Sequence, residues 1–405
     1  MLGINEIKMK RRKFIKNSAL ATTMAFVPSF LKAFEGAFPN KFGHKNLVII
    51  HLMGGNDGLN TIVPINNDIY YNARPKIAIK KSDTIKLNYE IGFHKSLAPL
   101  KRLYDDGYLS IINNVGYPNP SRSHFTSTDI WHTASDHENI LETGWIGRYL
   151  DNYGRKPHNA IQIDDNLALA LRGERLNGIA TKQAKQLYRS LQESNFNSIL
   201  SHYDNSHLTE HNLGYLYKTM IDAKSSARYL YEKTLDSKLS ESYPKKSSLA
   251  SQLKVVGQFI NSGIDTSVYY TTLNGFDTHA FQNNKHENLL KVYAEAVDAF
   301  VKDLKRNNTF KDTLILTFSE FGRRVEQNYS DGTDHGAANN IFVIGENLKR
   351  AGFYNQLANL KDLDDNGDLK YEIDFREVYA TILNNWLEVD DRRILNKVFS
   401  KLNFI

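Results

Sequence analysis

The chain has 405 residues, of which 41% are hydrophobic and 24% charged, and it contains no cysteine. This composition is typical of a folded protein with an ample core, and the lack of cysteine excludes a disulfide framework, a thiolate metal site and a lipid-attached N-terminal cysteine. The formal charge is +6, but residues 1–35 carry seven lysines and arginines against two glutamates, so the remainder is close to neutral at +1. A nucleic-acid partner is therefore not predicted.

The first 40 residues have the pattern of an export signal. Lys10-Arg11-Arg12-Lys13-Phe14-Ile15-Lys16 precedes a weakly apolar stretch from Ala19 to Leu31 that contains Pro28. The pattern is similar to a twin-arginine signal, and the apolar stretch is too short and too interrupted for a stable membrane span. The sequence thus predicts a signal peptide over residues 1–40 that engages the twin-arginine translocase, and a periplasmic or extracellular bacterial protein. A basic amphipathic helix is the alternative interpretation.

The segment after the leader favours an α/β fold. Leu47–Met53 is a near-continuous β-branched run of the kind that parallel sheets bury on both faces. A predicted helix over Ser96–Asp105 and a predicted strand over Tyr108–Asn113 follow it. This alternation of strand, helix and strand is characteristic of the α/β class.

The middle of the chain interrupts the alternation. From about Asn166 to Lys246 the sequence predicts long polar and aromatic helices, which we interpret as a helical insertion or cap over the functional site. Alternation then resumes with the helix Ser248–Asn261, the strand Ser267–Leu273, the helix Leu289–Lys305 and the strands Thr313–Phe318 and Asn340–Gly345. We expect one α/β domain over residues 41–405 that includes the insertion at 166–246.

An apparent calcium motif near the C-terminus is better explained as a turn. Residues 362–367 fit the first half of an EF-hand loop, but the acid required at the twelfth position falls on Ile373. The flanking alternation of apolar residues predicts a hairpin turn at Asn366-Gly367 instead.

Acids and histidines follow three of the predicted strands. Asp57 lies in the turn Gly54–Gly58, Asp277 and His279 follow the second of these strands, and Glu320 and then Asp334-His335 follow the third. Ligands bind beyond the carboxyl ends of strands in open α/β sheets, and oxygen and nitrogen donors suit divalent metals. The pattern predicts that these side chains converge on one metal-dependent site. The alternatives are a cap at Asp57, a surface loop at Asp277 and His279, a hydrogen-bonded loop histidine at His335, and an ion pair between Glu320 and a neighbouring arginine.

A candidate nucleophile and candidate anion contacts lie nearby in the sequence. Ser121 and Ser123 stand at the predicted start of a helix, where the dipole favours a negative charge, although a serine N-cap is the alternative role. Arg323 or Arg324 could hold an anionic oxygen in a bidentate contact. The turn at Gly54 does not match the dinucleotide fingerprint, and the acid at Asp57 opposes a pyrophosphate, so a nucleotide-dependent oxidoreductase is disfavoured.

Several short motifs together resemble one family. They are the twin-arginine leader, Gly54-Gly-Asn-Asp-Gly58, Ser121-Arg-Ser-His-Phe125, Gly144-Trp-Ile-Gly-Arg148, Gly275-Phe-Asp-Thr-His279, Ser319-Glu-Phe-Gly-Arg323, Gly332-Thr-Asp-His-Gly336 and Asp374-Phe-Arg376. From about residue 45 to the C-terminus the chain resembles the secreted domain-of-unknown-function 1501 family, which looks like a branch of the alkaline phosphatase and sulfatase superfamily. The resemblance implies an alkaline-phosphatase-like three-layer α/β sandwich with a mostly parallel central sheet.

The resemblance also implies a reaction, the hydrolysis of a phosphate or sulfate ester at a site of one or two divalent ions, which could be Zn, Mn, Mg or Ca. The implied ligands are Asp57 and Glu320 on one ion and Asp277, His279 and His335 on the other. Ser121 or Ser123 would attack, and Arg122 would hold the anionic ester of a small molecule or glycan.

Two departures from the superfamily pattern bear on this reading. Phe321 stands where a histidine for the second ion is expected, so that ion could be absent or held by Asp334 or His124. The missing cysteine excludes a formylglycine nucleophile. A non-catalytic envelope or extracellular binding protein with a degraded site is the alternative function.

Overall fold

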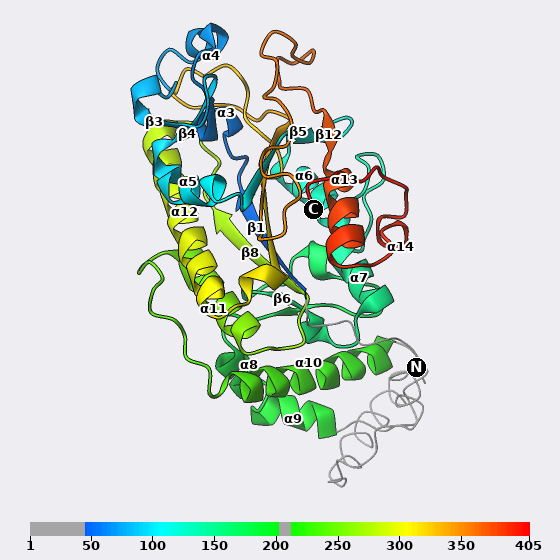
Figure 1. Cartoon of the computed structure of the whole chain (residues 1–405). Coiled ribbons are helices and arrows are strands. Elements are labelled where there is room, and N and C mark those ends of the chain that lie inside the picture. The colour runs from blue at the N-terminus through cyan, green and yellow to red at the C-terminus, as the bar shows by residue number, and fades with distance from the viewer. Residues whose placement is uncertain (1–44, 202–211) are drawn as a thin grey trace.

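The computed structural model describes residues 45–201 and 212–405, so the predicted signal peptide lies outside the described residues. A nine-stranded sheet with the order β11-β5-β10-β9-β1-β8-β6-β7 forms its centre, and β12 pairs with β5 (Figure 1). The strands are β1 (Asn46–Met53), β5 (Leu109–Gly116), β6 (Ala160–Gln162), β7 (Ile179–Ala180), β8 (Val268–Asn274), β9 (Thr313–Phe318), β10 (Asn339–Ile344), β11 (Gly352–Phe353) and β12 (Ile373–Asp374). In the described chain the pairings of this sheet are parallel except those of β10. The predicted α/β fold with a mostly parallel sheet is confirmed.

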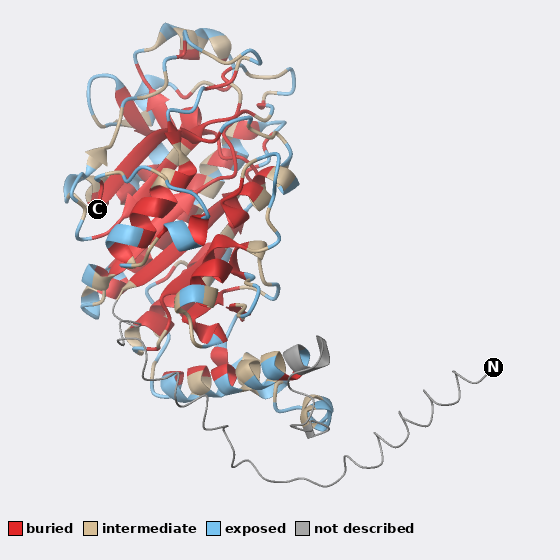
Figure 2. Cartoon of the chain, turned by 90° about the vertical axis from the view of Figure 1, so that its right-hand side faces the viewer, coloured by how far each residue is buried: buried red, intermediate tan, exposed pale blue. Residues whose placement is uncertain are grey.

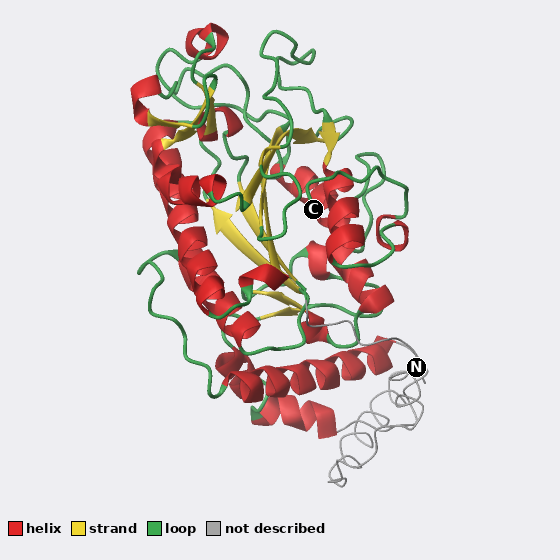
Figure 3. Ribbon diagram, in the orientation of Figure 1, coloured by secondary structure: helices red, strands yellow, loops and turns green. Residues whose placement is uncertain are grey.

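Strand β1 lies in the middle of the sheet because its side chains are apolar on both faces. Val48 and Ile50 pack into one core, Leu47 and Ile49 pack into the other, and all four are at most 1% exposed. One helical layer contains α5 (Ala98–Asp105), α11 (Ser248–Asn261) and α12 (Gln282–Arg306), and the other contains α6 (His124–Thr133), α7 (Trp145–Tyr153), α13 (Phe375–Thr381) and α14 (Arg392–Leu395). The result is a three-layer sandwich whose buried residues concentrate in the sheet and the inner helix faces (Figures 2 and 3).

A small second sheet lies beyond the carboxyl end of β1. Strands β2 (Ile62–Pro64), β4 (Ile91–His94) and β3 (Thr84–Lys86) are antiparallel in that order, and the short helices α3 (Gly58–Thr61) and α4 (Asp68–Ala73) accompany them (Figure 1). Helix α3 begins at Gly58, the last residue of the glycine-rich turn. This unit therefore flanks the loops that carry the predicted site residues.

Most boundaries of the predicted elements agree with the structure within two residues, and two differ by more: β5 ends at Gly116 instead of the predicted Asn113, and α12 begins earlier than predicted. Helix α11 and strand β9 have the predicted limits, whereas α12 begins at Gln282 instead of the predicted Leu289. The first two turns of α12 are polar, and Gln282 and His286 are buried through hydrogen bonds. Apolar periodicity, on which the prediction rested, therefore did not detect them.

The helices of the middle segment lie far from the predicted site. They are α8 (Ala184–Ser190), α9 (Ser194–Ser201) and α10 (Asn212–Thr234), and Figure 1 shows them at the end opposite α3 and α4. Ser226 hydrogen-bonds His158 (3.0 Å), and Tyr229 accepts from the backbone N–H of Asp265 (2.9 Å). His158 and Asp265 precede β6 and β8, so α10 packs at the amino-terminal edge of the sheet. The expectation that this segment caps the site is therefore wrong, because helix patterns do not reveal which edge of a sheet a helix covers.

The predicted turn at Asn366-Gly367 is confirmed. Leu363 and Leu369 form an antiparallel bridge, and Gly367 has a φ of +78°, which a glycine adopts without strain. The side chain of Asp364 accepts the backbone N–H of Asn366 at 2.9 Å inside this turn.

Candidate metal centre

Three loops meet beyond the carboxyl ends of the parallel strands. His124 follows β5 at the start of α6, Asp277 follows β8, and His335 precedes the antiparallel β10. One ligand atom from each of these residues lies within 4.8 Å of the other two. The distance from Asp277 Oδ1 is 3.4 Å to His124 Nε2 and 3.3 Å to His335 Nε2. The structure thus brings together two predicted ligands, Asp277 and His335, with His124, which the sequence offered only as a substitute ligand.

His279 lies at the rim of the same cluster. Its Nδ1 is 2.8 Å from Asp277 Oδ1, and its ring centroid is 4.6 Å from that of His335. The side chains of Asp277 and His279 are 49% and 45% exposed, so the cluster opens to solvent on this side. An open side is what a bound substrate or water would require.

The two histidines of the cluster have fixed orientations. His335 Nδ1 lies 2.6 Å from the carbonyl oxygen of Arg122, and because a carbonyl only accepts, Nδ1 carries the proton and Nε2 presents a lone pair to Asp277. His124 Nδ1 lies 2.7 Å from Glu320 Oε1, and because the carboxylate accepts, Nδ1 of His124 also carries the proton. Its Nε2 is buried and has no hydrogen-bond partner among the described residues. A buried, unpaired ring nitrogen beside a carboxylate is what the ligand set of a divalent cation would leave.

Hydrogen bonds, charges and burial shift the pKa values of three residues of the cluster. Burial favours a higher pKa for Asp277, but the hydrogen bond and charge of Arg323 outweigh it and keep that pKa well below its usual range. The hydrogen bond to Glu320 raises the pKa of His124, and burial lowers the pKa of His335. The carboxylate of Asp277 is therefore ionised at neutral pH and ready to bind a cation.

Glu320 contacts His124 at Nδ1, the ring nitrogen that does not face Asp277. It is completely buried and accepts hydrogen bonds from His124 Nδ1, from His51 Nε2 (3.1 Å) and from the backbone N–H of Gly54 (2.8 Å). Burial favours a higher pKa for Glu320, but the hydrogen bonds from His124 and His51 hold the pKa well below its usual range. With these donors around it, Glu320 orients His124 rather than facing the cluster, unlike the ligand role expected from the sequence.

Asp57 belongs to a separate buried network. It caps α3 by accepting from the N–H groups of Leu59 (3.1 Å) and Asn60 (3.2 Å), and its other oxygen pairs with Arg74 Nη1 at 2.6 Å and accepts from Gln282. Burial favours a higher pKa for Asp57, yet the Arg74 charge gives a net lowering of that pKa. The cap, which the sequence left open as the alternative, is the role that the structure shows. Arg74 carried no sequence signal, because it lies in a polar segment outside every motif.

The predicted anion contacts have other partners. Arg323 is buried, and its guanidinium donates to the carbonyl oxygens of Gly54, Gly55, Phe276 and Thr333 and to the carboxylate of Asp277. It therefore ties three loops together beneath the cluster. Arg122 pairs with the buried Asp368 through Nε at 2.8 Å. Both guanidinium groups are thus paired with carboxylates, and a contact of either with an anionic substrate stays a prediction.

The remaining predicted residues lie around the cluster. Ser123 is the N-cap of α6, where its Oγ accepts from Thr126 (3.5 Å), and Ser121 Oγ accepts from the N–H of Ser123 (3.2 Å). Asp334 is exposed and accepts from Asn328 at 3.1 Å. Phe321 packs its ring 4.8 Å from both His124 and His335, so it forms an apolar wall where a histidine was expected.

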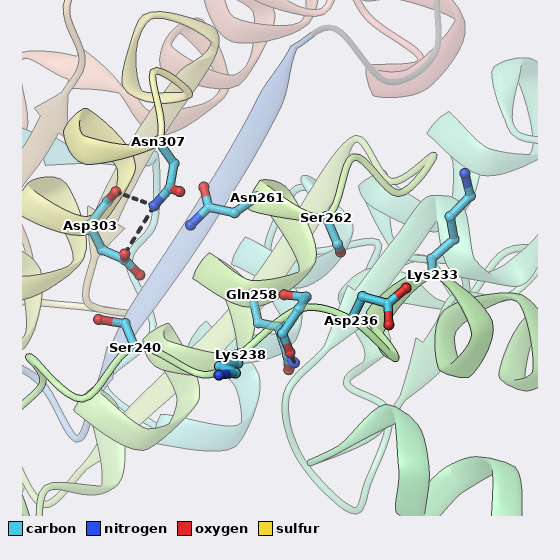
Figure 4. Close-up of a pocket in the computed structure, with 10 residues that line it drawn as sticks. Lys233, Asp236, Lys238, Ser240, Gln258, Asn261, Ser262, Asp303 and Asn307 are labelled. Carbon is cyan, nitrogen blue, oxygen red and sulfur yellow. Dashed lines mark hydrogen bonds between the residues drawn. The ribbon is translucent and has the colours of Figure 1, made fainter.

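A cavity of about 420 Å³ lies elsewhere, between the end of α10 and helices α11 and α12 (Figure 4). Its lining is polar, and side chains such as Asp303, Asn307 and Gln258 already hydrogen-bond to neighbouring groups. The cavity contains none of the predicted site residues.

The comparisons with known proteins identify the family. The sequence model of the family described as "Protein of unknown function (DUF1501)" matches residues 44–399. The chain belongs to the DUF1501 family. A search of curated proteins finds no match to this DUF1501 sequence.

Solved structures similar to this DUF1501 protein include a lipoteichoic acid synthase, a periplasmic domain and a sulfatase. The lipoteichoic acid synthase LtaP from Listeria monocytogenes is 11% identical with a TM-score of 0.36, covering 91% of this chain and 81% of LtaP. The C-terminal periplasmic domain of EcEptC from Escherichia coli, in complex with Zn, is 11% identical with a TM-score of 0.38, covering 75% and 74%. The PsFucS1 sulfatase from Pseudoalteromonas sp. is 10% identical with a TM-score of 0.38, covering 98% and 74%. These values describe a distant likeness, so the chemistry of the site must be judged from its own side chains.

Proposed function

We propose that this DUF1501 protein is an exported metal-dependent hydrolase of phosphate or sulfate esters. The observation that carries the proposal is the convergence of His124 Nε2, Asp277 Oδ1 and His335 Nε2 within 4.8 Å of one another. His279, which also contacts Asp277, is a candidate fourth ligand. Imidazoles with one carboxylate favour zinc or another transition metal over magnesium or calcium. When bound, a divalent ion supplies Lewis-acid activation of an ester oxygen or of a water molecule.

The ligand arrangement favours one ion rather than two. Asp57 is neutralised by Arg74, Glu320 is surrounded by hydrogen-bond donors, and the apolar ring of Phe321 occupies the place of the expected histidine. A second cation would have to displace these donors from two buried carboxylates. The expectation of a second ion on Asp57 and Glu320 therefore has no support in the geometry.

Other residues of the chain position the ligands and offer a nucleophile. Arg323 fixes the turn after β1, the Asp277 loop and the Thr333 carbonyl relative to one another. Ser123 remains the candidate nucleophile, since it is exposed and directly precedes the ligand His124. Phosphate and sulfate esters follow as substrates from the resemblance of the motifs to the alkaline phosphatase and sulfatase superfamily.

A non-catalytic binding protein is the second candidate. It is favoured by the carboxylate partners of Arg122 and Arg323 and by the cap role of Ser123, which leave the ester with fewer dedicated contacts than a phosphatase site would offer. Such a protein would bind a metal without hydrolysing an ester.

The test measures metal content and hydrolysis on the same preparations. Wild type, Asp277→Ala, Ser123→Ala and the control Asp334→Asn, which changes an exposed acid outside the cluster, are assayed for bound zinc and for cleavage of nitrophenyl phosphate and nitrophenyl sulfate. We expect about one ion per chain and activity in wild type and the control, and neither in Asp277→Ala. A metal-free wild type, or hydrolysis that survives Asp277→Ala, contradicts the proposal. Metal binding without any hydrolysis favours the binding protein.

Export is proposed from the leader sequence. The arginine pair Arg11-Arg12 stands before an apolar stretch in the pattern of a twin-arginine signal. Within the two described ranges, no helix has the length and apolarity needed to cross a membrane. Replacing both arginines by lysine should leave the protein inside the bacterial cell, whereas the unchanged leader should deliver it to the periplasm or the medium; equal distribution of the two would contradict export by this route.

A further inference from the structure

A line of buried polar side chains runs from the candidate metal centre into the interior. Behind Glu320 lie His51 on β1, Tyr270 on β8 and His132 on α6, none more than 6% exposed. Glu320 Oε2 is 3.1 Å from His51 Nε2, His51 Nδ1 is 3.2 Å from Tyr270 Oη, and Tyr270 Oη is 2.8 Å from His132 Nε2. His124 Nδ1 contacts the other oxygen of Glu320 at 2.7 Å. The five side chains form one continuous hydrogen-bonded chain.

The chemistry of Glu320 fixes the direction of the nearest bonds. An ionised carboxylate only accepts, so both His51 Nε2 and His124 Nδ1 must present N–H to it. His51 consequently meets Tyr270 through Nδ1, and His124 is left with Nε2 toward Asp277. Burial raises the pKa of Tyr270 well above its usual value and lowers the pKa of His132 to about 3, so the far end of the chain is uncharged at neutral pH.

Burying these polar side chains costs the fold stability. His51 interrupts the apolar run of the central strand, and its ring stacks on Phe318 with centroids 4.6 Å apart. Buried polar groups weaken a core unless every member of the network is satisfied. The two metal-facing histidines also differ: a backbone carbonyl orients His335, whereas a side-chain carboxylate that itself needs support orients His124.

We propose that Glu320 and the buried chain His51–Tyr270–His132 position His124 for metal binding. Together they hold its imidazole with Nδ1 protonated and Nε2 directed at Asp277. This inference rests on the proposed metal centre and gives Glu320 a role as positioning residue in place of metal ligand. Partners behind a metal-bound histidine commonly change metal affinity by about 10- to 100-fold when they are removed.

The test compares two tyrosine-to-phenylalanine variants, each of which removes one buried hydroxyl. Tyr270→Phe breaks the chain, whereas Tyr293→Phe removes a buried hydroxyl that bonds Thr317 at 3.0 Å and has no contact with Glu320. Zinc affinity is measured by competition with a chromophoric chelator. We expect roughly tenfold weaker binding for Tyr270→Phe, a larger loss for Glu320→Gln, and no change for Tyr293→Phe. Equal affinities of the two tyrosine variants overturn the inference while leaving the metal centre intact.

A second readout does not depend on metal binding. Nitrogen chemical shifts of labelled histidines in the metal-free protein report which ring nitrogen of His124 carries the proton. We expect the Nδ1–H form in wild type and Tyr293→Phe, and a mixture of both forms in Glu320→Gln. A wild-type His124 that carries its proton at Nε2 and none at Nδ1 overturns the inference whether or not zinc binds. Failure of the proposed function shows instead as a wild type that binds no metal but has His124 protonated at Nδ1.

Discussion

Two aspartates that follow neighbouring strands have opposite surroundings in this protein. Asp57 after β1 is completely buried and paired with Arg74, whereas Asp277 after β8 is half exposed and faces two imidazoles. Both carboxylates are stabilised in the ionised form, but the charge of Asp57 is already neutralised by a partner inside the protein. Asp277 is also paired, with Arg323, but it is half exposed and accessible to a cation, whereas Asp57 is enclosed.

This difference predicts different consequences of mutation. Arg74→Met removes the partner of a buried carboxylate, which typically costs about 3–5 kcal/mol of the free energy of unfolding. We expect urea denaturation to show a loss of this size, while the folded fraction keeps its zinc. Asp277→Ala should show the reverse: loss of zinc with a smaller loss of stability, because Arg323, which loses this carboxylate, still donates to four carbonyl oxygens. A metal-free but stable Arg74→Met would mean that Asp57 contributes to the metal centre after all.

The turn after β1 is the element that sets the floor of the site. Gly54 has a φ of +118°, and a Cβ at this position would lie 2.4 Å from the backbone nitrogen of Asp277. Glycine is required here both for its backbone conformation and for the close approach of the β8 loop. The turn and the Asp277 loop are thus packed backbone to backbone.

Gly54→Ala should displace Asp277 as well as destabilise the fold. We expect a loss of more than about 2 kcal/mol in the free energy of unfolding, from strain and overpacking together, and weaker zinc binding. Gly263→Ala is the matched control, since Gly263 also has a positive φ (+66°) but nothing lies within 4 Å of its added Cβ. The control should lose about 1–2 kcal/mol of the free energy of unfolding from strain alone and keep its zinc affinity. Denaturation measures the stability of both variants, and chelator titration measures their zinc affinity. Equal zinc affinity in Gly54→Ala would show that the two loops can separate without disturbing the ligands.

Helix α10 is attached at the opposite edge through a buried histidine. His158 hydrogen-bonds Ser226 and stacks on Tyr229 with ring centroids 4.5 Å apart. Burial lowers the pKa of His158 to about 4, below the value of roughly 6.5 expected in the unfolded chain. Between these two values the unfolded state binds a proton that the folded state does not, so stability falls as the pH falls.

The pH dependence of this contact can be isolated with His158→Gln. The contribution of His158 should decrease by at most roughly 1.4 kcal/mol per pH unit below pH 6.5 and level off near pH 4. Urea unfolding of wild type and His158→Gln at pH 7, 6 and 5 should therefore show a stability difference that shrinks as the pH falls. Other buried histidines act equally in both proteins and cancel in the difference. A difference that is constant with pH would mean that His158 titrates alike in the folded and unfolded states.

At the scale of the whole molecule, the sequence predicted what depends on local pattern. The apolar runs of β1 and β9 and the acids after them predicted a parallel sheet with candidate metal ligands at its carboxyl edge, and that edge holds Asp277 and His335. The partners of those acids depend on long-range contacts, so the pairing of Asp57 with Arg74 and of Glu320 with His51 could not be read from the chain. The place of α10 at the far edge is likewise decided by packing that no helix pattern records.

The proposed metal centre should also act on the stability of the whole fold. Its ligands come from segments after β5, after β8 and before β10, which span much of the chain, so a bound ion stabilises the folded state as one unit. A ligand at 100 times its Kd adds roughly 2.7 kcal/mol to the free energy of unfolding. We expect a chelator to lower the Tm of the wild type and added zinc to restore it. The control Asp334→Asn should respond like the wild type, whereas Asp277→Ala should respond to neither treatment. Because the proposed centre holds one ion, the titration should saturate at about one zinc per chain, and saturation at two would restore Asp57 and Glu320 as ligands of a second ion.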